Sequence, residues 1–157
     1  MLATTICKNP VYVSICQEAL LSKPFDLPWQ VTIVNDRCVS PLYEVIDRIM
    51  TWEYDWDGYG ASAIPIEVGR NCRNFIKTIQ KMDIDYMVHE DGIEPTTYGT
   101  VLFEFVTDSG KVIVEIGSSQ MAFFTDYKQG KNDSSENIFS TFNTIPDSLQ
   151  ESLDKIR

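Results

Sequence analysis

Two glutamates, Glu104 and Glu115, are the pair of side chains in this sequence best placed to do chemistry together. They lie in two runs of alternating apolar and polar residues, 100–107 and 111–117, which predict adjacent antiparallel strands. If Ser109-Gly110 is the two-residue turn between these strands, Glu104 and Glu115 face each other directly. Two carboxylates held that close repel, raise each other's pKa, and are suited to bind a cation or to act as an acid/base pair. The simpler hypothesis is that this face of the sheet meets solvent and that both acids keep it soluble.

A second candidate site is the stretch Thr51–Ala61, which reads TWEYDWDGYGA and mixes aromatic with acidic residues. Aromatic anchors beside charges are typical of protein-binding surfaces, and similar residue types recognise sugars. At helical spacing Trp52 and Trp56 fall on one side, so we expect both to hold the fold, with Trp56 in the core. The remaining acids and tyrosines are the predicted partner-binding residues: Glu53, Tyr54, Asp55, Asp57 and Tyr59.

The sequence lacks the common signatures of catalysis and cofactor binding. No GxSxG, HExxH, Walker-type or GxGxxG motif occurs, so we predict no catalytic residue and no cofactor. The four cysteines, at positions 7, 16, 38 and 72, do not have the spacing of zinc ligands, and we predict no metal site. The single histidine, His89, adjoins two acids without an identifiable catalytic partner, which favours an exposed position at the end of a strand.

The charge of the chain restricts its partners. The formal net charge is −10 and the isoelectric point is about 4.4. Neutralising phosphates requires clustered Lys and Arg, so nucleic acid and anionic membrane surfaces are disfavoured, whereas a basic protein would be attracted. No apolar run reaches the length of a membrane span, and the first residues lack the basic start and continuous apolar run expected of a signal peptide. With scattered cysteines, these features predict a cytoplasmic protein.

Two amphipathic helices are expected on either side of the aromatic stretch. Ser40 and Pro41 are typical of an N-cap and a first helical position. The apolar stripe of this helix consists of Leu42, Val45, Ile46, Ile49 and Met50. We expect the helix to run into the aromatic stretch and to end by Asp57-Gly58. The second helix is predicted to open at Pro65, and its apolar face consists of Val68, Cys72, Phe75, Ile76, Ile79 and Met82.

An antiparallel β-meander is predicted after residue 83, where the hydrophobic period changes from 3.6 to 2. Residues 85–90 form a possible strand, which we expect to end at the turn-rich Asp91-Gly92. Three strands are predicted to follow, at 100–107, 111–117 and 121–127. In the first two, one face is uniformly apolar: Val101, Phe103, Phe105, Val112, Val114 and Ile116. A second turn at Ser118-Ser119 would pair Ile116 with Met121 and place Lys111 beside Asp126.

The rest of the chain contributes shorter elements. Residues 29–35 (WQVTIVN) alternate as in a strand, residues 128–144 are predicted to form a mobile loop, and the tail from Ile145 predicts a short C-terminal helix. Helices segregated from a run of antiparallel strands indicate an α+β fold. We therefore predict a single domain over 1–157, best defined over 40–127, with two amphipathic helices packed on a β-meander, an N-terminal strand and a C-terminal helix.

The run Trp56–Ala61 (WDGYGA), followed by Pro65 at the start of a helix, resembles a widespread set of small bacterial proteins. The similarity extends over roughly 52–127 and includes the pattern Gly99–Phe105 (GTVLFEF) and a following hairpin. In those proteins the aromatic residue after the glutamate is often Trp, whereas this chain has Phe105 there. The resemblance implies a bacterial cytoplasmic origin and an α+β layout. It supplies no catalytic residue and no ligand.

Three functions are compatible with these features. The negative charge, the missing catalytic signatures and the aromatic–acidic stretch favour a non-enzymatic interaction protein, an antitoxin-like, immunity-like or defence-accessory neutraliser of a basic partner. The first alternative is a carboxylate-based enzyme or small-ligand-binding domain that uses Glu104 and Glu115. The second alternative is a carbohydrate-binding module that uses the aromatic residues of 52–59.

Overall fold

The computed structural model describes residues 40–139 and 142–157. In these residues the helices are α1 (Pro41–Ile49), α2 (Ile66–Lys81) and α3 (Asp147–Ile156), with a short 3-10 helix, η1 (Asp85–Met87), before the sheet. The strands are β1 (Val88–Pro95), β2 (Val101–Thr107), β3 (Gly110–Ile116), β4 (Gln120–Tyr127) and β5 (Ser134–Phe139). The strand predicted at 29–35 lies outside the described residues. None of the described helices is long and apolar enough to cross a membrane.

Helix α1 begins as predicted and ends earlier than predicted. Pro41 opens the helix, Ser40 occupies the N-cap position without a side-chain hydrogen bond, and the apolar stripe is buried except for the half-buried Met50. The expected continuation to Asp57-Gly58 is wrong, because the helix stops at Ile49. The backbone N–H of Asp55 donates instead to the carbonyl of Ala61 at 2.8 Å, so the chain folds back into a loop.

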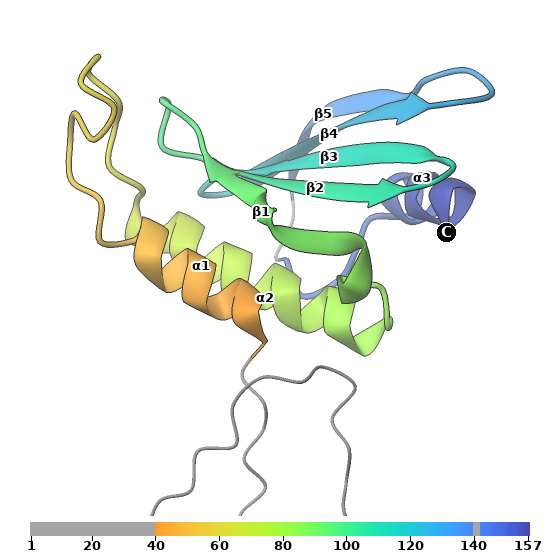
Figure 1. The fold of residues 1–157 in the computed structure, drawn as a ribbon, viewed down its shortest axis with the longest axis horizontal. Helices are drawn as coiled ribbons and strands as arrows, with labels where there is room; N and C mark the ends of the chain where they lie inside the picture. The colour runs from red at the N-terminus through yellow and green to blue at the C-terminus, as the bar shows by residue number, and fades with distance from the viewer. Residues whose placement is uncertain (1–39, 140–141) are drawn as a thin grey trace, which may run out of the picture. The chain divides into compact units, whose positions relative to one another are not determined.

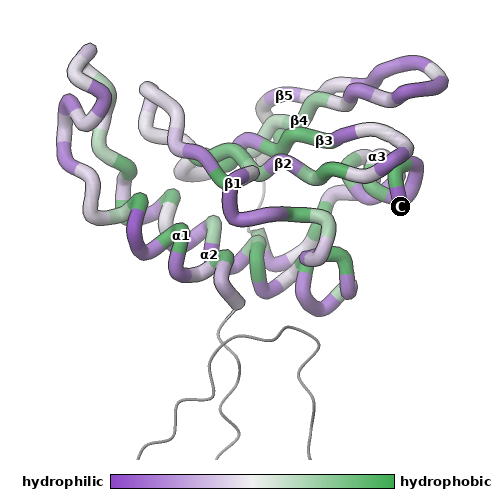
Figure 2. The backbone as a smooth tube through the Cα atoms, in the orientation of Figure 1, coloured by the Kyte–Doolittle hydropathy of each residue, from purple (hydrophilic) through white to green (hydrophobic). Residues whose placement is uncertain are grey.

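Helix α2 confirms the second predicted helix. Its buried side chains include Val68, Cys72, Phe75, Ile76 and Ile79, and Pro65 is its N-cap. Hydrophobic and hydrophilic residues recur at helical spacing along α1 and α2 (Figure 2). This amphipathic pattern explains why both helices bury one side and leave the other in water.

The sheet is an antiparallel meander in which each strand pairs with its neighbour along the chain, in the order β1-β2-β3-β4-β5 (Figure 1). The first strand runs past the turn expected at Asp91-Gly92 and continues to Pro95, with an irregular register between Val88 and Ile93. A bulge of this kind absorbs extra residues without ending the pairing.

The turn between β2 and β3 lies one residue earlier than predicted. Thr107 pairs with Gly110, so Asp108 and Ser109 form the two-residue turn, and the predicted Ser109-Gly110 turn is wrong. The Thr107 hydroxyl accepts a 3.1 Å hydrogen bond from the backbone N–H of Ser109, which favours the turn there. Gly110 is needed inside the strand, because a Cβ at this position would lie 2.6 Å from the carbonyl oxygen of Asp126. Moving the turn by one residue shifts each β2 residue to a β3 partner two positions earlier than predicted. Because side chains alternate between the two faces, the apolar face is preserved.

The turn between β3 and β4 is confirmed at Ser118-Ser119. Ile116 pairs with Met121, Val114 with Phe123, and Lys111 with Asp126. The Asn71 side chain on α2 donates hydrogen bonds of 2.9 and 2.8 Å to the carbonyls of Gly117 and Ser118. This contact ties the turn to the helical layer.

The mobile loop predicted over 128–144 is wrong for Ser134–Phe139, which form β5 and pair with β4. The buried Thr125 starts this pairing. Its hydroxyl donates to the carbonyl of Asp133 at 2.9 Å and accepts from the N–H of Asp133 at 2.6 Å. The segment between β4 and β5 is a loop and is largely hydrophilic, and residues 142–144 also lie outside any helix or strand (Figure 2).

The core lies between the helices and one face of the sheet, which we call the inner face. Phe75 of α2 packs edge-on against Phe103 and Phe105, with ring centroids 5.2 and 6.1 Å apart. The C-terminal helix is confirmed as α3, and its Leu149, Leu153 and Ile156 join the same core as α1 and α2. The α+β fold class is therefore confirmed, with helices on one face of an antiparallel meander.

Candidate protein-binding loop

The connection between α1 and α2 is a loop shaped by its own carboxylates. Oδ1 of Asp57 accepts hydrogen bonds from the backbone N–H groups of Tyr59 (2.8 Å) and Ala61 (3.1 Å). Oδ1 of Asp55 accepts one from Gly60 at 2.7 Å. Gly58 and Gly60 have φ angles of +76° and +91°, a region that glycine enters at little cost. Two acids predicted to meet a partner thus also fix the backbone of the loop.

The two tryptophans pack against each other within this loop. Their ring centroids are 4.9 Å apart at an interplanar angle of 42°, and Nε1 of Trp56 donates to the carbonyl of Ser62 at 3.1 Å. Both rings are half-buried, so the prediction of Trp56 in the core is wrong. The physical reason is that α1 ends at Ile49, before its apolar stripe could reach either ring.

The tyrosines of the loop project into solvent. Tyr54 is 73% exposed and Tyr59 is 94% exposed, and Glu53 beside them is also exposed. Asp55 is exposed and Asp57 is half-buried. The expectation that Tyr54 and Tyr59 face outward therefore agrees with their exposure, whereas the carboxylate of the exposed Asp55 is bound to the backbone N–H of Gly60.

A third exposed tyrosine, Tyr98, was missed by sequence reasoning. It is 86% exposed in the turn between β1 and β2. This turn adjoins the loop, because the N–H of Ser62 donates to the carbonyl of Thr97 at 3.0 Å, and both segments project from the same end of the sheet (Figure 1). The turn-forming residues around Tyr98 indicated an exposed position in the sequence. That Tyr98 lies close to the loop could not be predicted, because it depends on the tertiary fold.

The predicted pairing of Glu104 with Glu115 is wrong. Glu104 faces Ile113 across the strands, and Glu115 faces Leu102, because the β2–β3 turn lies one residue earlier than predicted. Each carboxylate has its own partner. Nζ of Lys111 donates to Glu104 at 3.0 Å, and the Thr100 hydroxyl donates to Glu115. The hydrogen bond with Glu104 raises the pKa of Lys111 above its ordinary value. An acid/base mechanism shared by the two glutamates has no geometric support here.

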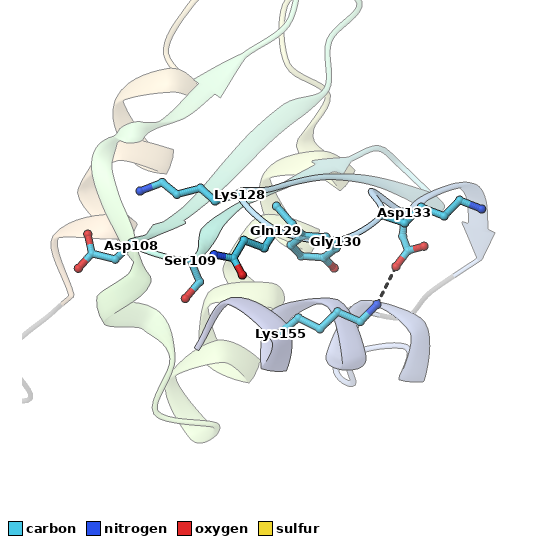
Figure 3. Close-up of a pocket in the computed structure, with 9 residues that line it drawn as sticks. Asp108, Ser109, Lys128, Gln129, Gly130, Asp133 and Lys155 are labelled. Atoms are coloured by element: carbon cyan, nitrogen blue, oxygen red, sulfur yellow. Dashed lines mark hydrogen bonds and ion pairs between the residues drawn. The ribbon is translucent and has the colours of Figure 1, made fainter.

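A pocket of about 720 Å³ lies between the β2–β3 turn, the β4–β5 loop and α3 (Figure 3). Nζ of Lys155 lies 2.7 Å from the Asp133 carboxylate and 5.3 Å from the ring centre of Tyr127. The hydrogen bond to Asp133 raises the pKa of Lys155. Sequence reasoning missed the pocket because its lining residues come from segments far apart in the sequence, which only the tertiary fold brings together. Its three lysines are largely balanced by two aspartates, so the pocket carries only a small net positive charge.

The remaining residues that could do chemistry are dispersed. Cys72 is buried in α2, and burial raises the pKa of its thiol from 9.0 to about 12, which keeps it protonated and unreactive. His89 is exposed on β1. Within residues 40–139 and 142–157, no group of three or more His, Cys, Asp or Glu side chains could hold a metal ion.

No protein-family model, curated protein or solved structure matches the chain. The function must therefore be inferred from the surfaces of the described residues. Among the predicted site residues, the structure brings together the members of the loop 51–62, and it separates the two glutamates of the sheet.

Proposed function

We propose that the chain is an acidic protein-binding protein, and that the loop 51–62 contacts a basic protein partner. The observation that carries this proposal is the position of Tyr54 and Tyr59, which project from a loop whose backbone is fixed by its own hydrogen bonds. Exposed aromatic side chains supply large contact areas, and a preformed loop loses little entropy on binding. The net charge of −10 and the exposed Glu53 favour a partner of opposite charge.

The proposed biological role is that of a neutralising partner in the bacterial cytoplasm, similar to an antitoxin, an immunity protein or a defence accessory. Such a role requires a rigid acidic surface and no catalytic machinery. Neither alternative is favoured by a specific observation. The two glutamates that an enzyme would share have separate partners. Of the aromatic residues of 52–59 that a sugar-binding module would present, the two tryptophans are packed on each other.

The test compares the immobilised full-length wild-type chain with three variants in a lysate of the source organism. The wild-type chain and a Tyr86→Ala control should retain the same protein, because Tyr86 is a 61% exposed tyrosine in η1, outside the loop. A Tyr54→Ala/Tyr59→Ala variant should lose that protein. A Glu53→Lys variant should associate more slowly, with a reduced dependence on salt. Equal retention by all chains, or no retained protein at all, would contradict the proposal.

A further inference from the structure

The face of the sheet opposite the core, which we call the outer face, is open in the part of the chain that the structure describes. The helices bury their side chains on the inner face. On the outer face Phe124 is 48% exposed and Val106 is 49% exposed, and Leu102, Ile113 and Ala122 are half-buried. Covering apolar side chains in this arrangement with another element removes them from water and lowers the free energy.

A groove crosses this face. A hollow of about 280 Å³ is lined by the apolar side chains of Leu102, Ile113 and Phe124. A second hollow of about 290 Å³ extends it toward Thr100 and Gln120. Both hollows share Glu115, Ala122 and Glu136. Ala122 pairs with Glu115 across the strands, and its small side chain leaves the space open.

The outer face is strongly acidic. The cross-strand pairs place Glu94, Glu104, Glu115 and Asp126 on it, and Glu136 lines the groove. Lys111 is the cation that the same pairs place there, and it is already bound to Glu104. The groove is thus an apolar hollow flanked by carboxylates, and an occupant must supply apolar side chains together with positive charge.

We infer that the outer face docks a cationic amphipathic helix of a partner protein. An apolar side chain of that helix enters the hollow beside Phe124, and its Lys or Arg side chains lie against Glu115 and Glu136. A helix can cover the face of an antiparallel sheet, and an apolar stripe flanked by cations matches this groove in shape and charge. No residue that lines the two hollows belongs to the loop 51–62, so the two surfaces can be tested with separate variants.

The test uses the full-length chain and a synthetic 18-residue helical peptide of Leu and Lys as the probe. A scrambled peptide of the same composition lacks the apolar stripe, and a Leu/Glu peptide reverses the charge. We expect only the unscrambled Leu/Lys peptide to bind at micromolar concentration by calorimetry. It should shift the methyl resonances of Leu102 and Ile113 in NMR spectra.

Three variants locate the binding. Ala122→Leu fills the hollow, and Glu115→Gln/Glu136→Gln removes two charges from it. Each should raise the Kd about tenfold, equivalent to about 1.4 kcal/mol. The matched control, Glu67→Gln/Glu151→Gln, removes the same charge from exposed positions on α2 and α3 and should leave the Kd unchanged. The melting temperature of each variant establishes that it is folded.

Several results would overturn the inference. These are equal binding of the scrambled peptide, no binding of the Leu/Lys peptide, and an unchanged Kd for Ala122→Leu. Contacts in NMR spectra between Ile113 and residues 1–39 of the free chain would show that the chain covers its own outer face. A dimer that Ala122→Leu converts to a monomer would show that a second copy covers it. A Tyr54→Ala/Tyr59→Ala variant should bind the peptide normally, so failure here leaves the loop proposal intact.

Discussion

The carboxylate of Asp55 accepts a 2.7 Å hydrogen bond from the backbone N–H of Gly60. An acid in an aromatic–acidic stretch would ordinarily be assigned to partner recognition, but this one is turned toward its own backbone. Its φ angle of +66° is uncommon for a residue other than glycine, and the hydrogen bond compensates for that conformation. In this loop, therefore, the carboxylates of the aspartates bind the backbone, and the tyrosine side chains are exposed to solvent.

Replacing Asp57 should weaken the loop, because its Oδ1 accepts two backbone hydrogen bonds. We expect Asp57→Ala to lower the free energy of unfolding by about 1 kcal/mol. Asp57→Asn keeps an acceptor oxygen and should lose less than half of that. Urea denaturation followed by tryptophan fluorescence measures both. If Asn destabilises the protein as much as Ala, the negative charge and not the hydrogen bonding is what the loop requires.

Gly110 is predicted to be the glycine least tolerant of substitution. An added Cβ would meet the Asp126 carbonyl oxygen at 2.6 Å and the Tyr127 Cα at 2.9 Å, and φ is +152°. We expect Gly110→Ala to cost about 3 kcal/mol in the free energy of unfolding. Gly130→Ala is the matched control, because Gly130 has a φ of +108° with nothing within 4 Å of the added Cβ. It should cost about 1 kcal/mol, and equal losses for the two variants would refute the close approach.

Thr125 is expected to hold β5 through its hydroxyl, which both donates to and accepts from the backbone of Asp133. Thr125→Val keeps the shape but leaves the N–H of Asp133 without that acceptor, at a cost of about 2 kcal/mol. Thr125→Ser keeps the hydroxyl and loses one methyl group, at a cost of about 1 kcal/mol. Hydrogen exchange of the Asp133 amide, measured with urea unfolding, should rise in the Val variant alone. Slow exchange in that variant would contradict the role of the hydroxyl.

Cys72 should not react with thiol reagents while the protein is folded, because burial raises the pKa of its thiol to about 12. At pH 8 a Cys72→Ser variant and the wild-type chain should react with Ellman's reagent to the same extent. In denaturant the wild-type chain should react at one additional thiol. A difference between the two native proteins would mean that the α2 face opens to solvent.

The same group makes stability depend on alkaline pH. The pKa in the folded protein, about 12, lies above the ordinary value of 9.0. The stability due to the neutral thiol is therefore fully present below pH 9.0 and is lost as the pH rises toward 12. Cys72→Ser should flatten this part of the stability profile, measured by urea denaturation at several pH values. An identical profile for the variant would show that other groups control alkaline unfolding.

Elements that bury one regular face were predictable from sequence alone. Helix α2 and strands β2, β3 and β4 have clear periods, so their burial follows from spacing. The β2–β3 turn was misplaced because Gly110 serves a close approach to β4, which is a tertiary requirement. Strand β5 has no comparable alternation, and its pairing depends on Thr125 and Asp133.

The candidate site was predictable only in part. The residue types of the loop indicated an exposed aromatic surface, and Tyr54 and Tyr59 are indeed exposed. The half-buried Trp56 was not predictable, because the chain after α1 folds back through the backbone hydrogen bond from the N–H of Asp55 to the carbonyl of Ala61. The partners of Glu104 and Glu115 depended on the strand register, so an error in the turn changed both.

The strict order of the sheet also has a kinetic consequence. Every strand pairs with its neighbour along the chain across a short connection, so the first contacts close small loops and lose little chain entropy. We expect the hairpins to form quickly, before the helices pack on their inner face. Until Phe75 of α2 packs against them, Phe103 and Phe105 are open to water, and the unfinished sheet is the species most prone to aggregate.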